Sequence, residues 1–112
     1  LIEGAWMATK SILYYVTENG KTPFLDWINK LDMKSEIIVD RLIQRVAQGG
    51  AKKSIKSLKD GVFEIKIPHA SGLRVYFAED GDSIIVLLVG GDKKTQTRDI
   101  NKAKEYWSNY GE

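Results

Sequence analysis

The sequence contains no cysteine and a single histidine, His69, in 112 residues. Disulfide bonds and thiolate metal sites are therefore excluded, and the absence of cysteine favours a cytoplasmic protein. One histidine cannot complete a transition-metal site, and the acidic residues do not follow the spacing of a calcium loop, so we expect no metal and no cofactor. His69 falls in a loop between two predicted strands, where it is either a general acid or base or an incidental residue.

Long hydrophobic segments are also missing. The longest apolar run, residues 84–89, is far too short to cross a bilayer, and no membrane partner is expected. Residues 1–6 lack the basic start and apolar stretch of a secretion signal, and they precede a methionine, Met7. We interpret residues 1–6 as a tag or an extension and residues 7–112 as a single domain, which suits a chain of this length.

Basic and acidic residues are nearly equal in number, 17 against 15, so the formal net charge is only +2 and the chain as a whole is not a polycation. The cations are nevertheless clustered in the second half of the sequence. The two clusters consist of Lys52, Lys53, Lys56, Lys59 and Lys66, and of Lys93, Lys94, Arg98, Lys102 and Lys104. Such clusters suggest a polyanionic partner, although ordinary solvated surface charge is the alternative.

Hydrophobic patterning predicts the elements of the first half. Residues 11–17 are rich in β-branched and aromatic side chains and predict a strand. Thr22 and Pro23 predict the start of a short helix, because threonine can cap free backbone N–H groups and proline suits the first helical position. Asp32 is predicted to cap a second helix, which the glycines at 49–50 end.

The second half changes to strand-like patterning. Residues 62–67 and 73–78 alternate between apolar and polar side chains, and residues 83–89 are apolar on both faces, which predicts a central buried strand. Residues 95–109 predict an amphipathic helix. The resulting order, β-α-α-β-β-β-α, predicts an α+β fold: a twisted, mainly antiparallel sheet, two N-terminal helices packed on it, and a C-terminal helix.

The alternating strands carry the first candidate site. Glu64 and Lys66 share one face of the first strand, and Arg74 and Tyr76 share the equivalent face of the second. If the strands pair, their apolar sets face the core and these four side chains gather on the outer face. An acid, two cations and a phenol suit phosphate chemistry. The alternative is an ordinary solvated face with a cross-strand ion pair.

The segment after the buried strand, G-G-D-K-K-T-Q at residues 90–96, adds to this site. Its glycines let the backbone approach a ligand closely. Lys93, Lys94 and Gln96 follow at the start of the last helix, where backbone N–H groups attract anions. The segment lacks the glycine directly before Lys-Thr that a nucleotide-binding P-loop requires, so that motif is rejected.

Four segments in order resemble the RelE/HigB toxin superfamily, and they look closest to its HigB-like addiction module killer proteins. The segments are L-K-D-G-V-F-E-I-K-I (58–67), G-L-R-V-Y-F (72–77), I-I-V-L-L-V-G-G-D-K-K-T-Q (84–96) and R-D-I-N-K-A-K-E-Y-W (98–107). The resemblance implies a RelE-like fold. It also implies the toxin of a type II toxin–antitoxin system: a metal-independent endoribonuclease that cuts messenger RNA on the ribosome and arrests translation and growth.

The resemblance also implies roles for individual residues. Arg74 matches the superfamily's phosphate-binding arginine, Lys66 a catalytic basic residue, Glu64 a general base, and Lys93 a cation that follows the sheet. We predict a further RNA-binding or phosphate-binding set comprising Lys56, Lys59, Tyr76, Lys94, Gln96 and Arg98. The match departs from the family pattern at Leu73, where a tyrosine is usual, and in the last helix, where the tyrosine of some members has no counterpart.

The same resemblance implies partners. These are a helix-turn-helix antitoxin encoded beside the toxin, the ribosome and its messenger RNA. Two alternatives share the fold: a gyrase poison of the ParE type without nuclease activity, and an inactive toxin-fold binding module. The cluster of cations around a potential base favours RNA cleavage over both.

Overall fold

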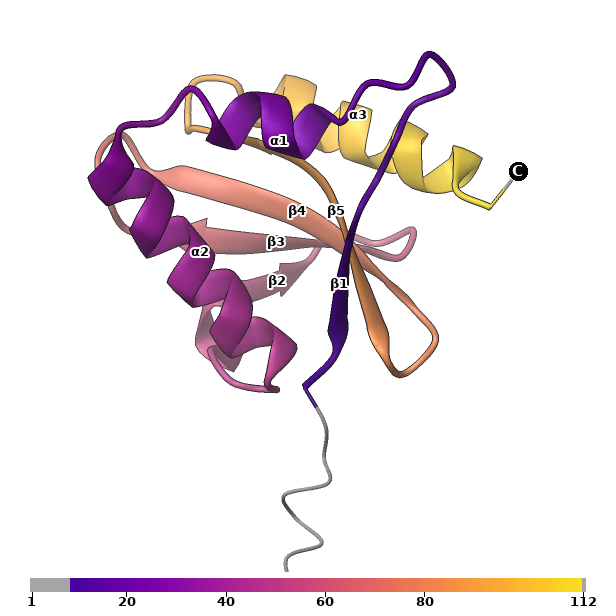
Figure 1. The fold of residues 1–112 in the computed structure, drawn as a ribbon, viewed down its shortest axis with the longest axis horizontal. Helices are drawn as coiled ribbons and strands as arrows, with labels where there is room; N and C mark the ends of the chain where they lie inside the picture. Colours follow the sequence, from indigo (N-terminus) through magenta and orange to yellow (C-terminus); the bar gives the residue numbers. More distant parts are fainter. Residues whose placement is uncertain (1–8, 112) are drawn as a thin grey trace, which may run out of the picture.

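The computed structural model describes residues 9–111, so the interpretation of residues 1–6 as a tag or extension lies outside the described chain. The elements, in order (Figure 1), are β1 (Ser11–Tyr14), α1 (Pro23–Ile28), α2 (Met33–Ala47), the short 3-10 helix η2 (Lys52–Ser54), β2 (Ile55–Ser57), β3 (Val62–Ile67), β4 (Leu73–Asp80), β5 (Ile84–Gly91) and α3 (Gln96–Asn109). Every predicted element is present. The 3-10 helix and β2 were not predicted.

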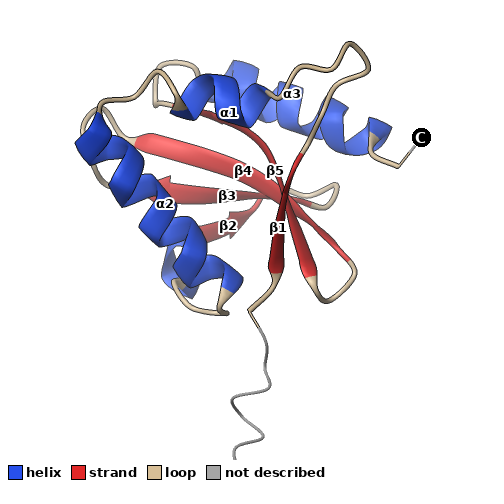
Figure 2. Ribbon diagram, in the orientation of Figure 1, coloured by secondary structure: helices blue, strands red, loops and turns tan. Residues whose placement is uncertain are grey.

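The strands form one five-stranded sheet in the order β1-β5-β4-β3-β2. β1 runs parallel to β5, and the other three pairs are antiparallel. Figure 2 shows the sheet between the N-terminal helices and α3. The predicted α+β fold is therefore confirmed, with the mainly antiparallel sheet and the two N-terminal helices packed against it.

Each face of the sheet has its own apolar core. On one face, Phe24 of α1 and Val39 and Ile43 of α2 pack against the sheet. On the other face, Ala103 of α3 packs with Val86 and its neighbours. β5 lies inside the sheet and contributes side chains to both cores, which explains why its sequence is apolar on both faces.

Helix starts are set by local interactions. Asp32 accepts a hydrogen bond from the Ser35 backbone N–H at 3.1 Å, which confirms it as the cap of α2. Pro23 occupies the first turn of α1 as predicted, but the Thr22 side chain makes no capping hydrogen bond. Among residues 9–111, no helix has the length and apolar character needed to cross a membrane.

The β4–β5 pairing contains one irregularity. Tyr76 pairs with Val89 while Phe77 pairs with Leu87, so Leu88 is an extra residue in β5. Such a bulge changes the alternation of the side chains that follow it.

After this bulge, two consecutive glycines face opposite helices. A Cβ atom at Gly90 would lie 2.1 Å from Cε3 of Trp27, and one at Gly91 would lie 1.8 Å from Oδ2 of Asp99. Both distances are far below van der Waals contact. The two glycines therefore let α1 and α3 approach β5 closely from its two faces.

Gly90→Ala tests this close approach. We expect a loss of about 1–3 kcal/mol in the free energy of unfolding, because the added methyl group overlaps the Trp27 ring. The measurement is urea-induced unfolding. Trp27→Leu, which removes the overlapping ring, is the matched background: there the cost of Gly90→Ala should be clearly smaller. Equal costs in the two backgrounds would contradict the contact.

Candidate functional site

The four polar residues of the predicted site do share a face of the sheet. Glu64 of β3 is paired with Tyr76 of β4, and Lys66 is paired with Arg74 in the same register. Because side chains alternate along a strand, both pairs project to the same side. This part of the geometry follows the sequence-based expectation.

The expectation that this face is open to solvent is wrong for three of the four. The exposed fractions are 4% for Glu64, 5% for Arg74 and 0% for Tyr76, whereas Lys66 is exposed. The physical reason is α3, whose apolar side, including Ala103, packs on this face. The structure therefore contains a buried acid–arginine pair with one cation at its edge.

Glu64 is the centre of a buried polar network. Its Oε2 lies 3.8 Å from Nε of Arg74 and accepts a hydrogen bond of 2.9 Å from Nε2 of Gln96. Gln96 is the first residue of α3, so the carboxylate links β3 and β4 to the start of that helix. Hydrogen bonds and ion pairs strengthen in such a dry environment, and leaving either charge unpaired there is costly.

Arg74 connects this network to the β3–β4 loop. Its Nη1 donates to the backbone oxygen of Gly72 at 2.6 Å, while its Nε has no hydrogen-bond partner among residues 9–111. Gly72 has φ +79°, and a Cβ there would lie 2.9 Å from Nη1 of Arg74 and 3.8 Å from Cβ of Lys93. The guanidinium thus lies beside the loop, close to the backbone that carries Lys93.

Tyr76 is enclosed next to Glu64. Its hydroxyl has no hydrogen-bond partner among residues 9–111. Burial raises the pKa of Tyr76 well above its usual value, and the charge of Glu64 raises it further. The phenol therefore stays protonated at neutral pH. It also has no surface through which to make the direct RNA contact predicted for it.

The segment between β5 and α3 is held by an acidic residue that the sequence analysis did not single out. Oδ1 of Asp92 accepts hydrogen bonds from the backbone N–H groups of Lys94 at 2.9 Å and Thr95 at 3.1 Å. These two N–H groups, which precede α3, are therefore not free to bind an anion. The Asp-x-x-Thr spacing was the available signal, since aspartate side chains commonly bond backbone N–H groups two or three residues ahead.

A second buried carboxylate, Asp99, lies in the first turn of α3 with an exposed fraction of 3%. It accepts a hydrogen bond from the Thr95 hydroxyl, and its Oδ1 lies 3.5 Å from Nε of Arg98. The Arg98 side chain is 70% exposed, so this ion pair is open to solvent on one side. The Asp99 carboxylate lies directly over Gly91, and Gly91 is paired with Arg74 in the sheet. Asp99 is therefore a neighbour of the Glu64–Arg74 pair.

The remaining predicted cations lie at the surface. Lys56 of β2 is paired with Glu64 and therefore projects to the same face of the sheet, and Lys59 lies in the turn that follows β2. The predicted cations that are exposed are Lys56, Lys59, Lys66, Lys93, Lys94 and Arg98. Lys59 precedes the start of β3, next to Asp60, which pairs with Lys104 late in α3, so Lys59 lies away from Lys66 and Arg74. The buried Glu64–Arg74 pair, Lys66 and the nearby Lys93 form the candidate site.

His69 is not part of this cluster. Its Nε2 lies 3.0 Å from Oγ of Ser35, and that hydroxyl donates to Oδ1 of Asp32 at 2.6 Å. The hydrogen bonds from Ser35 hold the pKa of Asp32 below its usual value. His69 therefore ties the β3–β4 loop to the start of α2. Within residues 9–111, no group of three or more histidine and acidic side chains is placed to hold a metal ion.

Comparison with known proteins places this site within a family. Residues 26–107 match the family described as Phage derived protein Gp49-like (DUF891). A protein of Haemophilus influenzae, described as uncharacterized, is 39% identical over 82 residues, which cover 72% of this chain and 82% of the relative. The family match includes the whole segment from Glu64 to Gln96, and hence the buried network.

The buried ion pair leads to a stability prediction. Arg74→Met should lower the free energy of unfolding by about 3–5 kcal/mol, because it leaves the Glu64 carboxylate buried without its cation. The double variant Glu64→Gln/Arg74→Met should recover part of that loss, since it removes both charges. Urea-induced unfolding measures both variants. A double variant less stable than Arg74→Met would show that the two charges do not interact.

Tyr76→Phe tests the unpaired hydroxyl. At pH 7 we expect little change in stability, because the lost hydroxyl has no hydrogen-bond partner. The pKa of Tyr76 is raised on folding, so its contribution to stability is complete below the unfolded-state pKa of about 10 and declines above it. Urea-induced unfolding should therefore show a smaller alkaline loss of stability in Tyr76→Phe than in the original protein. Equal losses would mean that Tyr76 ionises freely in the folded state.

Proposed function

Because this chain belongs to the Phage derived protein Gp49-like family, a family of RelE/HigB-type toxins, we propose that it is the toxin of a type II toxin–antitoxin system. We further propose that it arrests growth by cutting messenger RNA on the ribosome. The observation that supports this most directly is the group of exposed cations beside the buried Arg74. Lys66 is paired with Arg74 across the sheet, and the Cβ of Lys93 would lie 3.8 Å from a Cβ placed at Gly72 of the β3–β4 loop.

The proposed reaction needs no external nucleophile. The ribose 2′-hydroxyl attacks the adjacent phosphorus, and the bond to the 5′-oxygen of the next nucleotide breaks. The products are a 2′,3′-cyclic phosphate and a 5′-hydroxyl, and the proton lost from the 2′-oxygen is balanced by the proton gained at the 5′-oxygen. Cations stabilise the extra negative charge on phosphorus in the transition state.

The burial of the predicted residues favours different roles for them. Lys66 and Lys93 are exposed, so they are the ones we assign to the RNA phosphate. Arg74 is a positioning residue, because it holds the Gly72 turn and Glu64 in place. The role of general base that the resemblance implied for Glu64 does not fit this arrangement, since that carboxylate is buried and already accepts a hydrogen bond from Gln96.

The same burial favours a second candidate function. A gyrase poison of the ParE type needs no general base, and the enclosed Glu64 would suit such a binding protein. The exposed cations favour RNA cleavage, because phosphate contacts are what such side chains provide. Under either function, we propose a helix-turn-helix antitoxin as the neutralising partner, on the basis of the family alone.

Induction in cells, followed by mapping of messenger RNA 5′ ends, distinguishes the two functions. We expect growth arrest together with new 5′ ends inside translated codons. Intact transcripts accompanied by double-strand DNA breaks would support the gyrase function instead. Growth that never slows would support an inactive binding module.

Lys66→Ala/Lys93→Ala tests the assigned residues. Both side chains are exposed, so we expect an unchanged melting temperature and a fall of about a hundredfold or more in cleavage, since each cation stabilises the transition state. The matched control is Lys21→Ala/Lys30→Ala, which removes two exposed lysines flanking α1. The control should cut as the original does. Equal activity in both variants would remove Lys66 and Lys93 from the reaction.

A further inference from the structure

A second basic surface lies on the opposite face of the sheet, beside α2. A groove of about 470 Å³ runs between α2 and the end of β3. Its lining includes Arg41, Leu42, Arg45, Ile67, Pro68 and His69. It combines apolar walls with two arginines and an imidazole, a combination distinct from the Glu64–Arg74 network.

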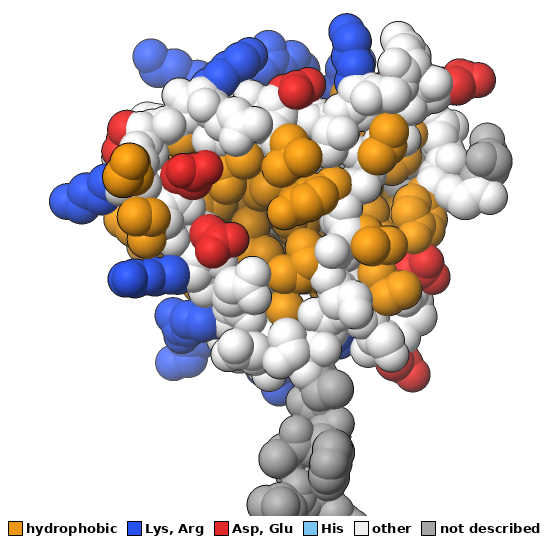
Figure 3. Space-filling view, in the orientation of Figure 1, with side chains coloured by type: hydrophobic (Ala, Val, Ile, Leu, Met, Phe, Trp, Pro, Cys, Tyr) orange, Lys and Arg blue, Asp and Glu red, His pale blue; other side chains and the backbone are white. Residues whose placement is uncertain are grey.

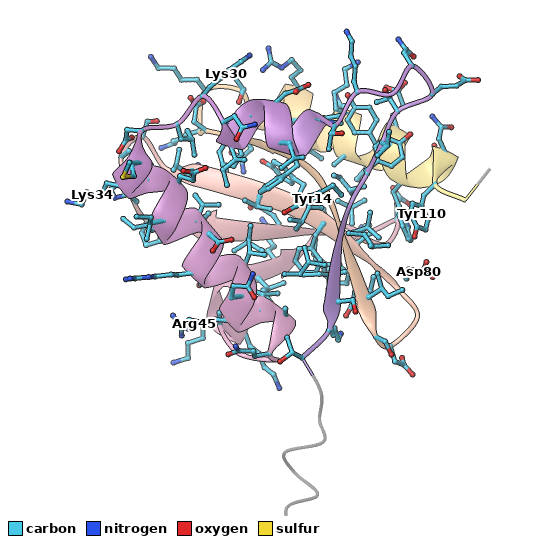
Figure 4. All side chains as sticks on the ribbon, in the orientation of Figure 1. Tyr14, Lys30, Lys34, Arg45, Asp80 and Tyr110 are labelled. Carbon is cyan, nitrogen blue, oxygen red and sulfur yellow. The ribbon has the colours of Figure 1, made fainter. Side chains whose placement is uncertain are left out.

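The two arginines of this groove are free to bind an anion. Arg41 and Arg45 are four residues apart on α2, so they project to the same side of the helix, and both are exposed. Neither forms an ion pair with any residue of the described chain, 9–111, and Figure 4 shows Arg45 projecting away from α2. In Figure 3, cationic side chains gather along the outer side of this helix.

Nearby charges leave the groove positive. Lys53 is exposed and directly precedes Ser54, another residue of the groove wall. The nearby acids on α2 are Glu36 and Asp40, which line a different cavity together with Arg41. A third, Asp32, is engaged by Ser35. Three exposed cations, Arg41, Arg45 and Lys53, therefore outnumber the two acids that are not engaged.

The β3–β4 loop joins this groove to the candidate site. At one end of the loop, His69 lines the groove and is held in place by its contact with Ser35. At the other end, the backbone oxygen of Gly72 accepts a hydrogen bond from Arg74, and a Cβ at Gly72 would lie 3.8 Å from the Cβ of Lys93. A strand of nucleic acid that crosses this loop would therefore meet both surfaces in succession.

We propose that the groove binds single-stranded RNA, as a continuation of the strand held at Lys66 and Lys93. This inference rests on the proposed function, because it takes the candidate site as the place of cleavage. The arginines contact phosphates, and the apolar wall formed by Ile38, Leu42 and Pro68 packs against a ribose or base. The groove supplies affinity and orients the strand, while the chemistry takes place on the other face.

The test measures binding without cleavage. The probe is a short fluorescent RNA with 2′-O-methyl riboses, which lacks the attacking hydroxyl, and its affinity is measured by anisotropy over a range of salt concentrations. Arg41→Gln/Arg45→Gln should weaken binding and lower the slope of log affinity against log salt by about 1.4, since each phosphate contact on a single strand contributes about 0.7. The matched control Lys21→Gln/Lys30→Gln removes the same charge and should leave the slope near its original value.

The possible outcomes separate this inference from the proposed function. An equal change of the salt slope in the arginine variant and in the lysine control would overturn the proposal that the groove binds RNA, because it would show only a general effect of charge. Binding of a polyglutamate peptide that requires both arginines, with RNA binding that does not, would assign the groove to an acidic protein. If arginine-dependent RNA binding is found but cells show no cleavage, the nuclease function fails while the groove stands. If cleavage occurs and the arginine variant binds and cuts as the original does, the RNA-binding role of the groove is wrong while the nuclease function stands.

Discussion

A carboxylate and a guanidinium enclosed beneath α3 set the geometry on which the candidate site depends. Removing charges from water is costly, and that cost is offset only when the charges are paired and hydrogen-bonded. Glu64 meets this condition through Arg74 and through Gln96, which begins α3. The start of α3 is therefore held over β3 and β4, directly after the segment that carries Lys93 and Lys94. The arrangement resembles a structural support more than a set of free catalytic groups.

The sequence was sufficient to predict which residues share a face, but not what covers that face. Period-two alternation places Glu64, Lys66 and Arg74 together without any tertiary information. Burial depends on where α3 packs, and no local pattern specifies this. Two features of the sequence did indicate that both faces are covered. Residues 83–89 are apolar on both faces of the predicted strand, and the last helix is amphipathic. Taken together, they imply that both faces of the sheet are covered.

Other differences between expectation and structure have equally local causes. Asp32 was predictable as a cap because its partner lies only three residues ahead. β2 was missed because three residues, Ile55–Ser57, are too few for an alternating pattern to be recognised, and their pairing with β3 is a tertiary interaction. Asp92 was overlooked because the adjacent lysines drew the interpretation toward anion binding, whereas its carboxylate already occupies the backbone N–H groups there.

The extra residue in β5 determines which face of the sheet each of the following residues points to. Leu88 changes the alternation so that Gly90 lies under α1 and Gly91 lies under α3. If Leu88 were instead paired in a regular ladder, Val89 would take the place of Gly90 beneath Trp27, and Gly90 would take the place of Gly91 beneath α3. We therefore expect the number of residues between the bulge and α3 to be the same throughout the family, because it decides which glycine faces α1 and which faces α3.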